Sequence, residues 1–341
     1  MEPAKNPSQS KVMLIVLVAG LVAFILYIYF FVNPDQVIDI LSKTNLTIYA
    51  GAFIAYLLYT FCSSLVWHRL LNSLSVKITK SKAFLFTWVG LFFDATVPQL
   101  GWSGEISKTY LLAKDSNVES GKIGASVVGQ KIFTMTMTIA ALSAGLGLVL
   151  INYSLPLEAT LLIALVLILS IVTLAVVYYV SFKPSATKTL LNWVIKVVLF
   201  FRKSWNHQNF GIKAEGILGN FHLNIEQLKA NPKALVQPII FAVAGFVFEV
   251  SVVFLTFAAL GQPLPVDVVL IVFTLTGMLQ TVGVAFFFPE LIMTMTFTAL
   301  GISPEVAVSV ALLTRVVNLW FRLVVSYVAL QWAGIKIIKQ N

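Results

Sequence analysis

The segment Pro98-Gln99-Leu100-Gly101-Trp102-Ser103-Gly104-Glu105 interrupts one apolar stretch of the chain, and Phe288-Pro289-Glu290 interrupts another in the opposite half. A proline inside a membrane helix frees backbone groups that hydrocarbon cannot satisfy, and a buried carboxylate there is costly. Such breaks are tolerated where they face other helices or a water-filled cavity, which is where membrane proteins handle polar cargo. The two interruptions therefore indicate a transporter rather than a passive anchor.

The composition places the chain outside the range of ordinary soluble domains. Of its 341 residues, 59% are hydrophobic and 11% are charged, and the mean hydropathy is +0.92. These values are typical of a polytopic membrane protein. The single cysteine, Cys62, excludes an intramolecular disulfide. Three scattered histidines form no metal-ligand pattern, so we expect neither a metal nor another cofactor.

Apolar runs of roughly 20 residues, long enough to cross a bilayer, predict the membrane spans. Six such runs occupy residues 12–32, 47–67, 123–151, 158–181, 235–260 and 306–333. The first run is too long for a typical signal-peptide core and lacks a small-residue cleavage site, so we expect a retained helix. The broken stretches, 83–97 and 268–300, are predicted to dip into the membrane and return. The expected fold is thus a single all-α domain over residues 1–341, with six transmembrane helices and two proline-broken re-entrant elements in an inverted arrangement.

The distribution of basic residues predicts the orientation. With an inner N-terminus and opposed dips, most of the 23 Lys and Arg residues fall on the cytoplasmic side, and the outer loops keep Lys43 alone. Both termini are then cytoplasmic in the cell membrane. The net charge of +9 reflects this topology and attraction to anionic lipids, and does not indicate nucleic-acid binding. A full crossing by either broken stretch is the competing layout, but it would weaken this asymmetry.

One polar segment, residues 182–234, separates the two halves. It is too short for an independent catalytic domain. Residues 188–203 have basic ends and an apolar body, as expected for a helix in the cytoplasmic interface. A second amphipathic helix is predicted from apolar residues at helical spacing: Ile217, Leu218, Phe221, Ile225 and Leu228. We interpret the segment as a cytoplasmic amphipathic connector, with a partner-binding module as the alternative.

Charged side chains also lie inside the predicted spans. Lys131 is about two turns into the 123–151 run, and Glu249 is in the middle of 235–260. Arg315 and Arg322 are seven positions apart and would share one face of an α-helix. The acids that almost balance these bases are Asp94, Glu105, Glu249 and Glu290. Because an unpaired charge is expensive in hydrocarbon, pairing is expected. Ion pairs that only lock helices together and a binding site for polar cargo are both consistent with this pattern.

The first interruption carries a family resemblance. Its motif consists of Pro98, Gly101, Gly104-Glu105, Lys108 and Leu111-Leu112, followed by Ser126-Val127-Val128 and Gln130-Lys131. This pattern resembles the transmembrane, flippase-like domain of bacterial lysylphosphatidylglycerol synthase, a family with free-standing archaeal and bacterial members. Pro289, Glu290, Leu300-Gly301 and Arg315 resemble its later motif, and the helix layout is similar over nearly the whole chain. As a departure, the family usually has proline and glycines just before the acid, whereas here Gly283 lies six residues before Pro289.

The resemblance implies translocation of a lipid or lipid-linked headgroup. Without the synthase's soluble aminoacyl-transferring domain, lipid lysinylation is not implied. Arginine suits phosphate because its planar guanidinium makes bidentate contacts. We therefore expect a flippase-like transporter of an anionic phospholipid or a polyprenyl-phosphate-linked lipid. The candidate substrate-binding residues are Glu105, Lys108, Lys131, Glu249, Glu290, Arg315 and Arg322. The candidate hinge residues are Pro98, Gly101, Gly104, Gly283 and Pro289.

Other functions stay open at this stage. A membrane-embedded glycosyltransferase acting on polyprenyl phosphate would usually need an Asp-x-Asp metal pair, and the sequence contains none. A structural scaffold would use the basic connector to recruit partners. No phosphate-binding loop of the Gly-x-x-x-x-Gly-Lys-Ser/Thr type is present, so we expect movement that is energy-independent or coupled to an ion. The expected partners are membrane lipids, with a possible homo-oligomer.

Overall fold

The structure is a computed structural model. It describes residue 22 and the ranges 25–26, 29–96, 102–116, 118–153, 157–201, 208–262, 266–281 and 289–340. Helices are the only regular secondary structure in these ranges. The all-α class is therefore confirmed.

Five helical segments of the described chain are long and apolar enough to cross a membrane. They are α3 (Leu46–Ser73), α6 (Ser120–Asn152), α7 (Leu157–Phe182), α10 (Pro232–Ala259) and the continuous helix formed by α13 (Pro304–Arg315), η1 (Val316–Phe321) and α14 (Arg322–Gln340). These segments coincide with five of the six predicted runs. Of the remaining run, 12–32, the structure describes only residues 22, 25–26 and 29–32.

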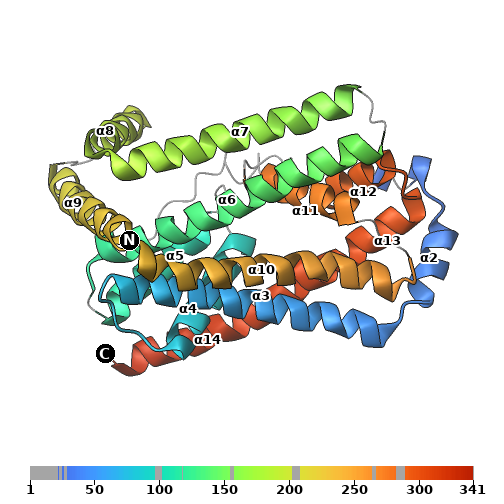
Figure 1. The fold of residues 1–341 in the computed structure, drawn as a ribbon. Helices are drawn as coiled ribbons and strands as arrows, with labels where there is room; N and C mark the ends of the chain where they lie inside the picture. The colour runs from blue at the N-terminus through green and yellow to red at the C-terminus, as the bar shows by residue number, and fades with distance from the viewer. Residues whose placement is uncertain are drawn as a thin grey trace.

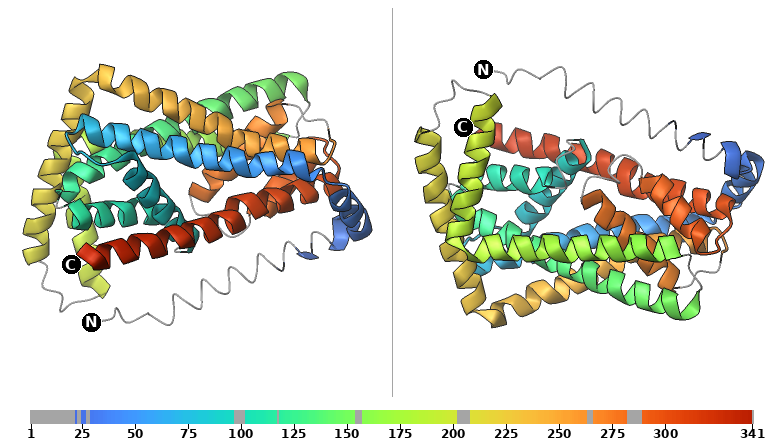
Figure 2. Two further views of the ribbon diagram at one scale, coloured as in Figure 1. Left: turned by 90° about the horizontal axis from the view of Figure 1, so that it is seen from below. Right: turned by 90° about the horizontal axis from the view of Figure 1, so that it is seen from above.

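The two interrupted stretches form helical hairpins that are too short to cross (Figure 1). The first consists of α4 (Lys80–Thr96) and α5 (Ser103–Ser116), and the second of α11 (Val266–Thr281) and α12 (Pro289–Ala299). None of these helices reaches the roughly 20 residues that a crossing needs. The hairpins enter the bundle from opposite ends, as both views in Figure 2 show. The inverted arrangement is confirmed, while Pro98, Gly101 and Gly283 lie outside the described residues.

Two glycines and a carboxylate hold the first hairpin closed. Gly90 of α4 and Gly104 of α5 approach so closely that a Cβ on Gly104 would overlap the Gly90 carbonyl oxygen and the Asp94 carboxylate. Asp94 Oδ1 accepts hydrogen bonds from the Gly104 N–H at 2.6 Å and the Ser103 hydroxyl at 3.0 Å. A carboxylate at the first N–H groups of a helix also complements the helix dipole. Asp94 thus acts as a cap for α5, supplied by the neighbouring helix.

The connector forms the helices α8 (Pro184–Phe201) and α9 (Gln208–Ala230). His222 of α9 is buried and joins the connector to the end of α7. Its Nδ1 lies 3.0 Å from the Ser181 carbonyl oxygen, and its Nε2 lies 2.9 Å from the Thr187 hydroxyl. Close contact between α9 and the first turn of α6 is possible because residue 121 is glycine. The predicted helical connector is therefore docked against one end of the bundle.

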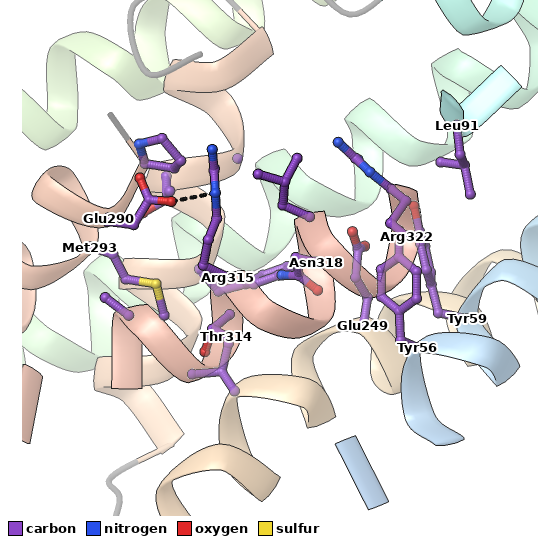
Figure 3. Close-up of a pocket in the computed structure, with 17 residues that line it drawn as sticks. Tyr56, Tyr59, Leu91, Glu249, Glu290, Met293, Thr314, Arg315, Asn318 and Arg322 are labelled. Atoms are coloured by element: carbon purple, nitrogen blue, oxygen red, sulfur yellow. Dashed lines mark ion pairs between the residues drawn. The ribbon is translucent and has the colours of Figure 1, made fainter. Parts of the chain in front are cut away.

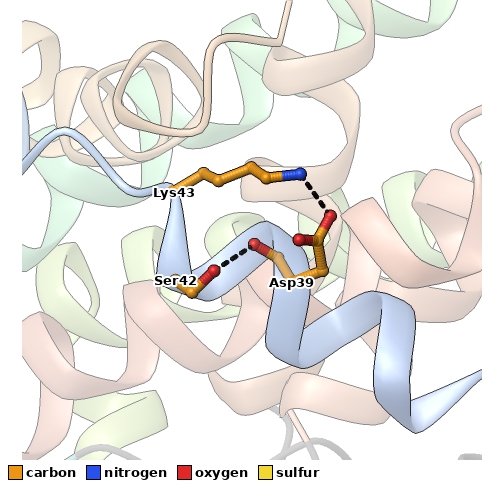
Figure 4. Close-up of polar contacts among 3 residues, drawn as sticks. All are labelled: Asp39, Ser42 and Lys43. Carbon is orange, nitrogen blue, oxygen red and sulfur yellow. Dashed lines mark hydrogen bonds and ion pairs between the residues drawn. The ribbon is translucent and has the colours of Figure 1, made fainter.

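The short helix α2 (Pro34–Ser42) lies at the other end of the bundle (Figure 1). Just after it, Lys43 Nζ pairs with Asp39 Oδ2 at 2.5 Å, and the Ser42 hydroxyl donates to the Asp39 carbonyl oxygen at 2.7 Å (Figure 4). The one basic residue predicted for the outer loops is thus neutralised by its own helix.

Two large apolar clusters form most of the core, and a small third cluster joins α2 to α13. One surrounds the first hairpin and includes Trp67, Phe86 and Val252. The other surrounds the second hairpin and includes Phe257 and Phe297. Helix α10 contributes to both clusters, and the polar groups described next lie where they meet.

Candidate functional site

A cavity of about 180 Å³ lies inside the bundle, beside the second hairpin (Figure 3). Its walls come from α3, α10, α11, the start of α12, and the helix that runs from α13 through η1 into α14. Leu91 of α4 also lines it, so both hairpins contribute side chains. Four of the predicted binding residues face this one space: Glu249, Glu290, Arg315 and Arg322.

One side of the cavity is closed by an ion pair. Arg315 Nε lies 2.6 Å from Glu290 Oε1. Pro289 begins α12 and places Glu290 in its first turn, where the helix dipole favours an acid. Arg315 ends α13. The pair therefore joins the second hairpin to the last spanning helix.

The other side of the cavity holds Arg322, Glu249, Tyr56 and Tyr59 (Figure 3). Neither Arg322 nor Glu249 forms an ion pair with any residue that the structure describes. The Nε of Arg322 is buried and has no hydrogen-bond partner. Arg322 thus keeps one buried donor beside the cavity that the protein itself does not satisfy.

Three further polar atoms around the cavity are buried without a partner: Thr276 Oγ1, Thr314 Oγ1 and Asn318 Oδ1. Most buried polar atoms in proteins are hydrogen-bonded. Their concentration at one cavity indicates a place for a polar ligand or for water. Sequence reasoning missed these residues, although Asn318 lies three positions after Arg315 in an otherwise apolar run and could have been noticed.

The helix between the two arginines is not an α-helix. Residues Val316–Phe321 form a π-helix, whereas the prediction that Arg315 and Arg322 share a face assumed 3.6 residues per turn. Both guanidinium groups nevertheless point to the same side of the helix (Figure 3). Short π segments inside α-helices occur frequently at functional sites.

The other predicted basic residues form a second polar cluster at the first hairpin. Lys108 is buried, donates to Gln130 Oε1 at 3.2 Å and lies 5.2 Å from the centre of the Trp67 ring. Lys131 lies 5.3 Å from the centre of the Trp102 ring. Glu105 has a buried Oε2 without a hydrogen-bond partner. None of Glu105, Lys108 and Lys131 lines the central cavity.

A narrower cavity of about 40 Å³ lies between the two groups of residues. Tyr59 and Glu249 line both cavities, and Gln130 and Ser63 line the narrow one. Gln130 Nε2 donates to the Ser63 carbonyl oxygen at 3.1 Å while its Oε1 accepts from Lys108. Polar side chains thus continue from the second hairpin toward the first.

Of the hinge candidates, Pro289 lines the central cavity and Gly104 packs against α4.

Within the described ranges, no group of three or more His, Cys, Asp or Glu side chains is arranged to hold a metal ion. The polar chemistry at the site therefore consists of guanidinium, ammonium, carboxylate, amide and hydroxyl groups. This set suits recognition of an anion that also carries hydroxyl or amine groups.

Comparison with known proteins assigns the chain to a family. Residues 15–326 match the family described as the lysylphosphatidylglycerol synthase TM region. A UPF0104 membrane protein of Methanothermobacter thermautotrophicus is 24% identical over 332 residues, which cover 96% of each chain. A UPF0104 membrane protein of Methanocaldococcus jannaschii is 24% identical over 312 residues, covering 90% of this chain and 91% of the relative.

A third UPF0104 membrane protein, from Pyrococcus horikoshii, is 19% identical over 309 residues, with 88% of this chain and 91% of the relative covered. No solved structure matches the chain significantly. Because the family match extends over most of the sequence and nearly all of the described helices, this protein belongs to the lysylphosphatidylglycerol synthase TM-region family.

Proposed function

We propose that this protein moves the phosphate-bearing headgroup of a membrane lipid across the bilayer. The substrate is an anionic phospholipid or a polyprenyl-phosphate-linked lipid. The observation that carries the proposal is the buried Nε of Arg322, which has no hydrogen-bond partner, beside a cavity between two opposed hairpins. Arginine binds phosphate by paired, charge-assisted hydrogen bonds. Family membership supports a membrane protein of this type, and the names of the relatives state no activity.

The cavity size supports a headgroup as the bound part. About 180 Å³ is smaller than the roughly 300–1,000 Å³ of sites that enclose a drug-sized ligand. A headgroup in this space would leave the lipid tails in the bilayer. If only the headgroup enters the cavity, the apolar lipid tails do not have to pass between polar side chains.

The ion pair between Glu290 and Arg315 serves as one gate in this proposal. A phosphate that reaches Arg322 competes with Glu290 for Arg315 and so loosens α12 from α13. The headgroup then passes Tyr59 and Gln130 toward the cluster of Glu105, Lys108 and Lys131. Inverted repeats with a central site are the usual architecture for alternating access.

We infer further that the end of the bundle bearing α9 faces the cytoplasm, that both termini lie on that side, and that the protein is in the cell membrane. These inferences follow the positive-inside rule. We also infer that the protein is a transporter and not an enzyme. A glycosyltransferase is the alternative that the experiment below must exclude.

The test is lipid scrambling in proteoliposomes. Purified protein is reconstituted with fluorescent phosphatidylglycerol, phosphatidylethanolamine or phosphatidylcholine, and outer-leaflet probes are quenched with dithionite. We expect exchange of the preferred lipid to fall at least tenfold in Arg322→Ala, Arg315→Ala and Glu105→Gln. Lys43→Ala, in the exposed pair with Asp39, is the matched control and should exchange at the wild-type rate.

Two results would reject the proposal. The first is unchanged exchange in cavity variants whose melting temperatures match the wild type. The second is transfer of sugar from a labelled nucleotide-sugar donor to polyprenyl phosphate by the purified protein. Repeating the scrambling assay with a short-chain fluorescent polyprenyl phosphate distinguishes transport of a phospholipid from transport of a polyprenyl-phosphate-linked lipid.

A further inference from the structure

A much larger hollow lies on the outside of the bundle, where α4 passes α14 and the middle of α3. Its volume is about 890 Å³, which is within the usual range for ligand sites. We call it the lateral groove. It shares no lining residue with the central cavity. The rings of Tyr56 and Trp88, with centres 6.2 Å apart, stand between the two spaces.

Most of the lateral groove is apolar. Phe61, Phe84 and Trp88 line one wall, and Val325, Val328 and Trp332 line the other. Along α14, two small residues spaced one turn apart also face the groove: Ala329 and Ala333. Val328 and Trp332 are exposed (59% and 57%) on a helix that crosses the membrane. Exposed apolar side chains on such a helix suit contact with acyl chains.

The groove has one polar end. Thr79, Lys80, Ser81 and Lys82 line it there, together with Asp115 of α5. This end follows directly after α3, which terminates at Ser73, so it lies at the end of the bundle. From Lys80 to Trp88 the groove follows α4 for about 12 Å at 1.5 Å per residue. This length approaches the roughly 15 Å of hydrocarbon in one leaflet.

At the polar end of the groove, the basic side chains outnumber the acidic ones. Asp115 is buried and forms an ion pair with Lys82, which neutralises one base. Lys80 is exposed and forms no ion pair with the described residues. The end of the groove thus keeps a net positive charge beside two hydroxyl groups. A cation at headgroup depth beside an apolar groove favours an anionic lipid over one with no net charge.

We propose that the lateral groove is a second lipid site, which holds one anionic phospholipid from the leaflet at the α9 end of the bundle. Its phosphate lies at Lys80, Ser81 and Thr79, and an acyl chain lies between α4 and α14. The bound lipid fills the space that the small side chains of α14 leave and supports the first hairpin from outside. This site is independent of the transport proposal, because no residue of the central cavity takes part.

The first experiment uses tryptophan fluorescence to detect the acyl chain of a lipid bound in the lateral groove. The full-length protein is reconstituted in vesicles that contain either brominated phosphatidylglycerol or brominated phosphatidylcholine at equal mole fraction. We expect the phosphatidylglycerol to quench the fluorescence of Trp332 at least threefold more effectively, as identified by the signal lost in Trp332→Phe. Lys80→Glu should abolish this preference. Lys233→Glu, an exposed base at the start of α10 at the same end of the bundle, should retain it.

The second experiment measures whether a lipid stays bound in the lateral groove. In native mass spectrometry of protein purified with added phosphatidylglycerol, we expect one retained lipid. Val328→Phe should lose it, whereas Val324→Phe, one turn away on α14 and outside the groove, should keep it. Both valines are exposed, so neither substitution disturbs the core.

Equal quenching by the two lipids, or an unchanged preference in Lys80→Glu, would overturn the proposal. Retention of the lipid by Val328→Phe would do the same. Arg322→Ala separates the two proposals, because it should keep the groove lipid even if it abolishes scrambling. Loss of the groove lipid in Arg322→Ala would instead assign the retained lipid to the central cavity.

Discussion

At the scale of single residues, the protein places charge where a membrane makes charge expensive. An ionised side chain at the bilayer centre costs about 2.5–3.5 kcal/mol on insertion scales, and more in isolation. Arg315 meets this cost with Glu290, but Arg322 and Glu249 lack an ion partner in the described chain. Helix-locking pairs alone would not leave Arg322 in this state. The arrangement favours a binding role for Arg322 and a structural, gating role for Arg315.

The gating role predicts a coupling energy between the two partners of the ion pair. In a double-mutant cycle with Glu290→Gln and Arg315→Met, we expect each single change to destabilise the protein and the double change to cost less than their sum. A coupling of about 1–3 kcal/mol is expected for contacting charges that are largely buried. Unfolding in mixed detergent measures it. A coupling near zero would mean that the pair does not join α12 to α13.

At the scale of elements, the first hairpin depends on backbone contact. Gly104 lies against the Gly90 carbonyl oxygen and the Asp94 carboxylate, so its missing side chain determines how closely α4 and α5 pack. The hydrogen bonds from Ser103 and Gly104 to Asp94 need the same closeness. Gly104 thus has a packing reason to be glycine, apart from any part in hinge motion.

This contact predicts a local destabilisation. Gly104→Ala should force α4 and α5 apart, at a cost of about 1–3 kcal/mol, as is usual for overpacking. Gly147→Ala is the matched control, because a Cβ on Gly147 of α6 meets nothing within 4 Å. We expect the melting temperature to fall in Gly104→Ala alone. Equal behaviour of the two variants would show that the hairpin tolerates separation.

At the scale of the whole molecule, the two ends of the bundle differ in chemistry. The connector, the start of α4 and the end of α14 lie at one end, and α2 lies at the other (Figures 1 and 2). The exposed bases of the connector and of the α3–α4 loop are at the first end, whereas Lys43 at the other is paired with Asp39. This asymmetry is the basis for the inferred orientation.

Cysteine labelling tests that orientation directly. Cys62 is buried and is the only cysteine, so Cys62→Ser provides a background without reactive thiols. In intact cells, an impermeant maleimide should label Asp39→Cys, and it should label Lys233→Cys only after permeabilisation. The reverse pattern would invert the topology. Labelling of both positions from outside would contradict a bundle that places them at opposite ends.

The class, the five described spans, the helical connector and the two opposed hairpins could all be predicted from the amino-acid sequence. These features follow from local properties: the length of each apolar run, the proline breaks and the placement of Lys and Arg in chain order. For the same reason the acids and bases of the membrane interior could be named in advance.

Which of those charges meet could be learned only from the folded arrangement of the helices. Glu290 reaches Arg315 because α12 returns against α13, whereas Glu105 is held at the first hairpin, away from the central cavity. The π-helix between Arg315 and Arg322, the unpartnered Oδ1 of Asn318 and the lateral groove also appear only in three dimensions. The cavity and the groove depend on packing between helices far apart in the chain, and hydropathy carries no information about which faces touch.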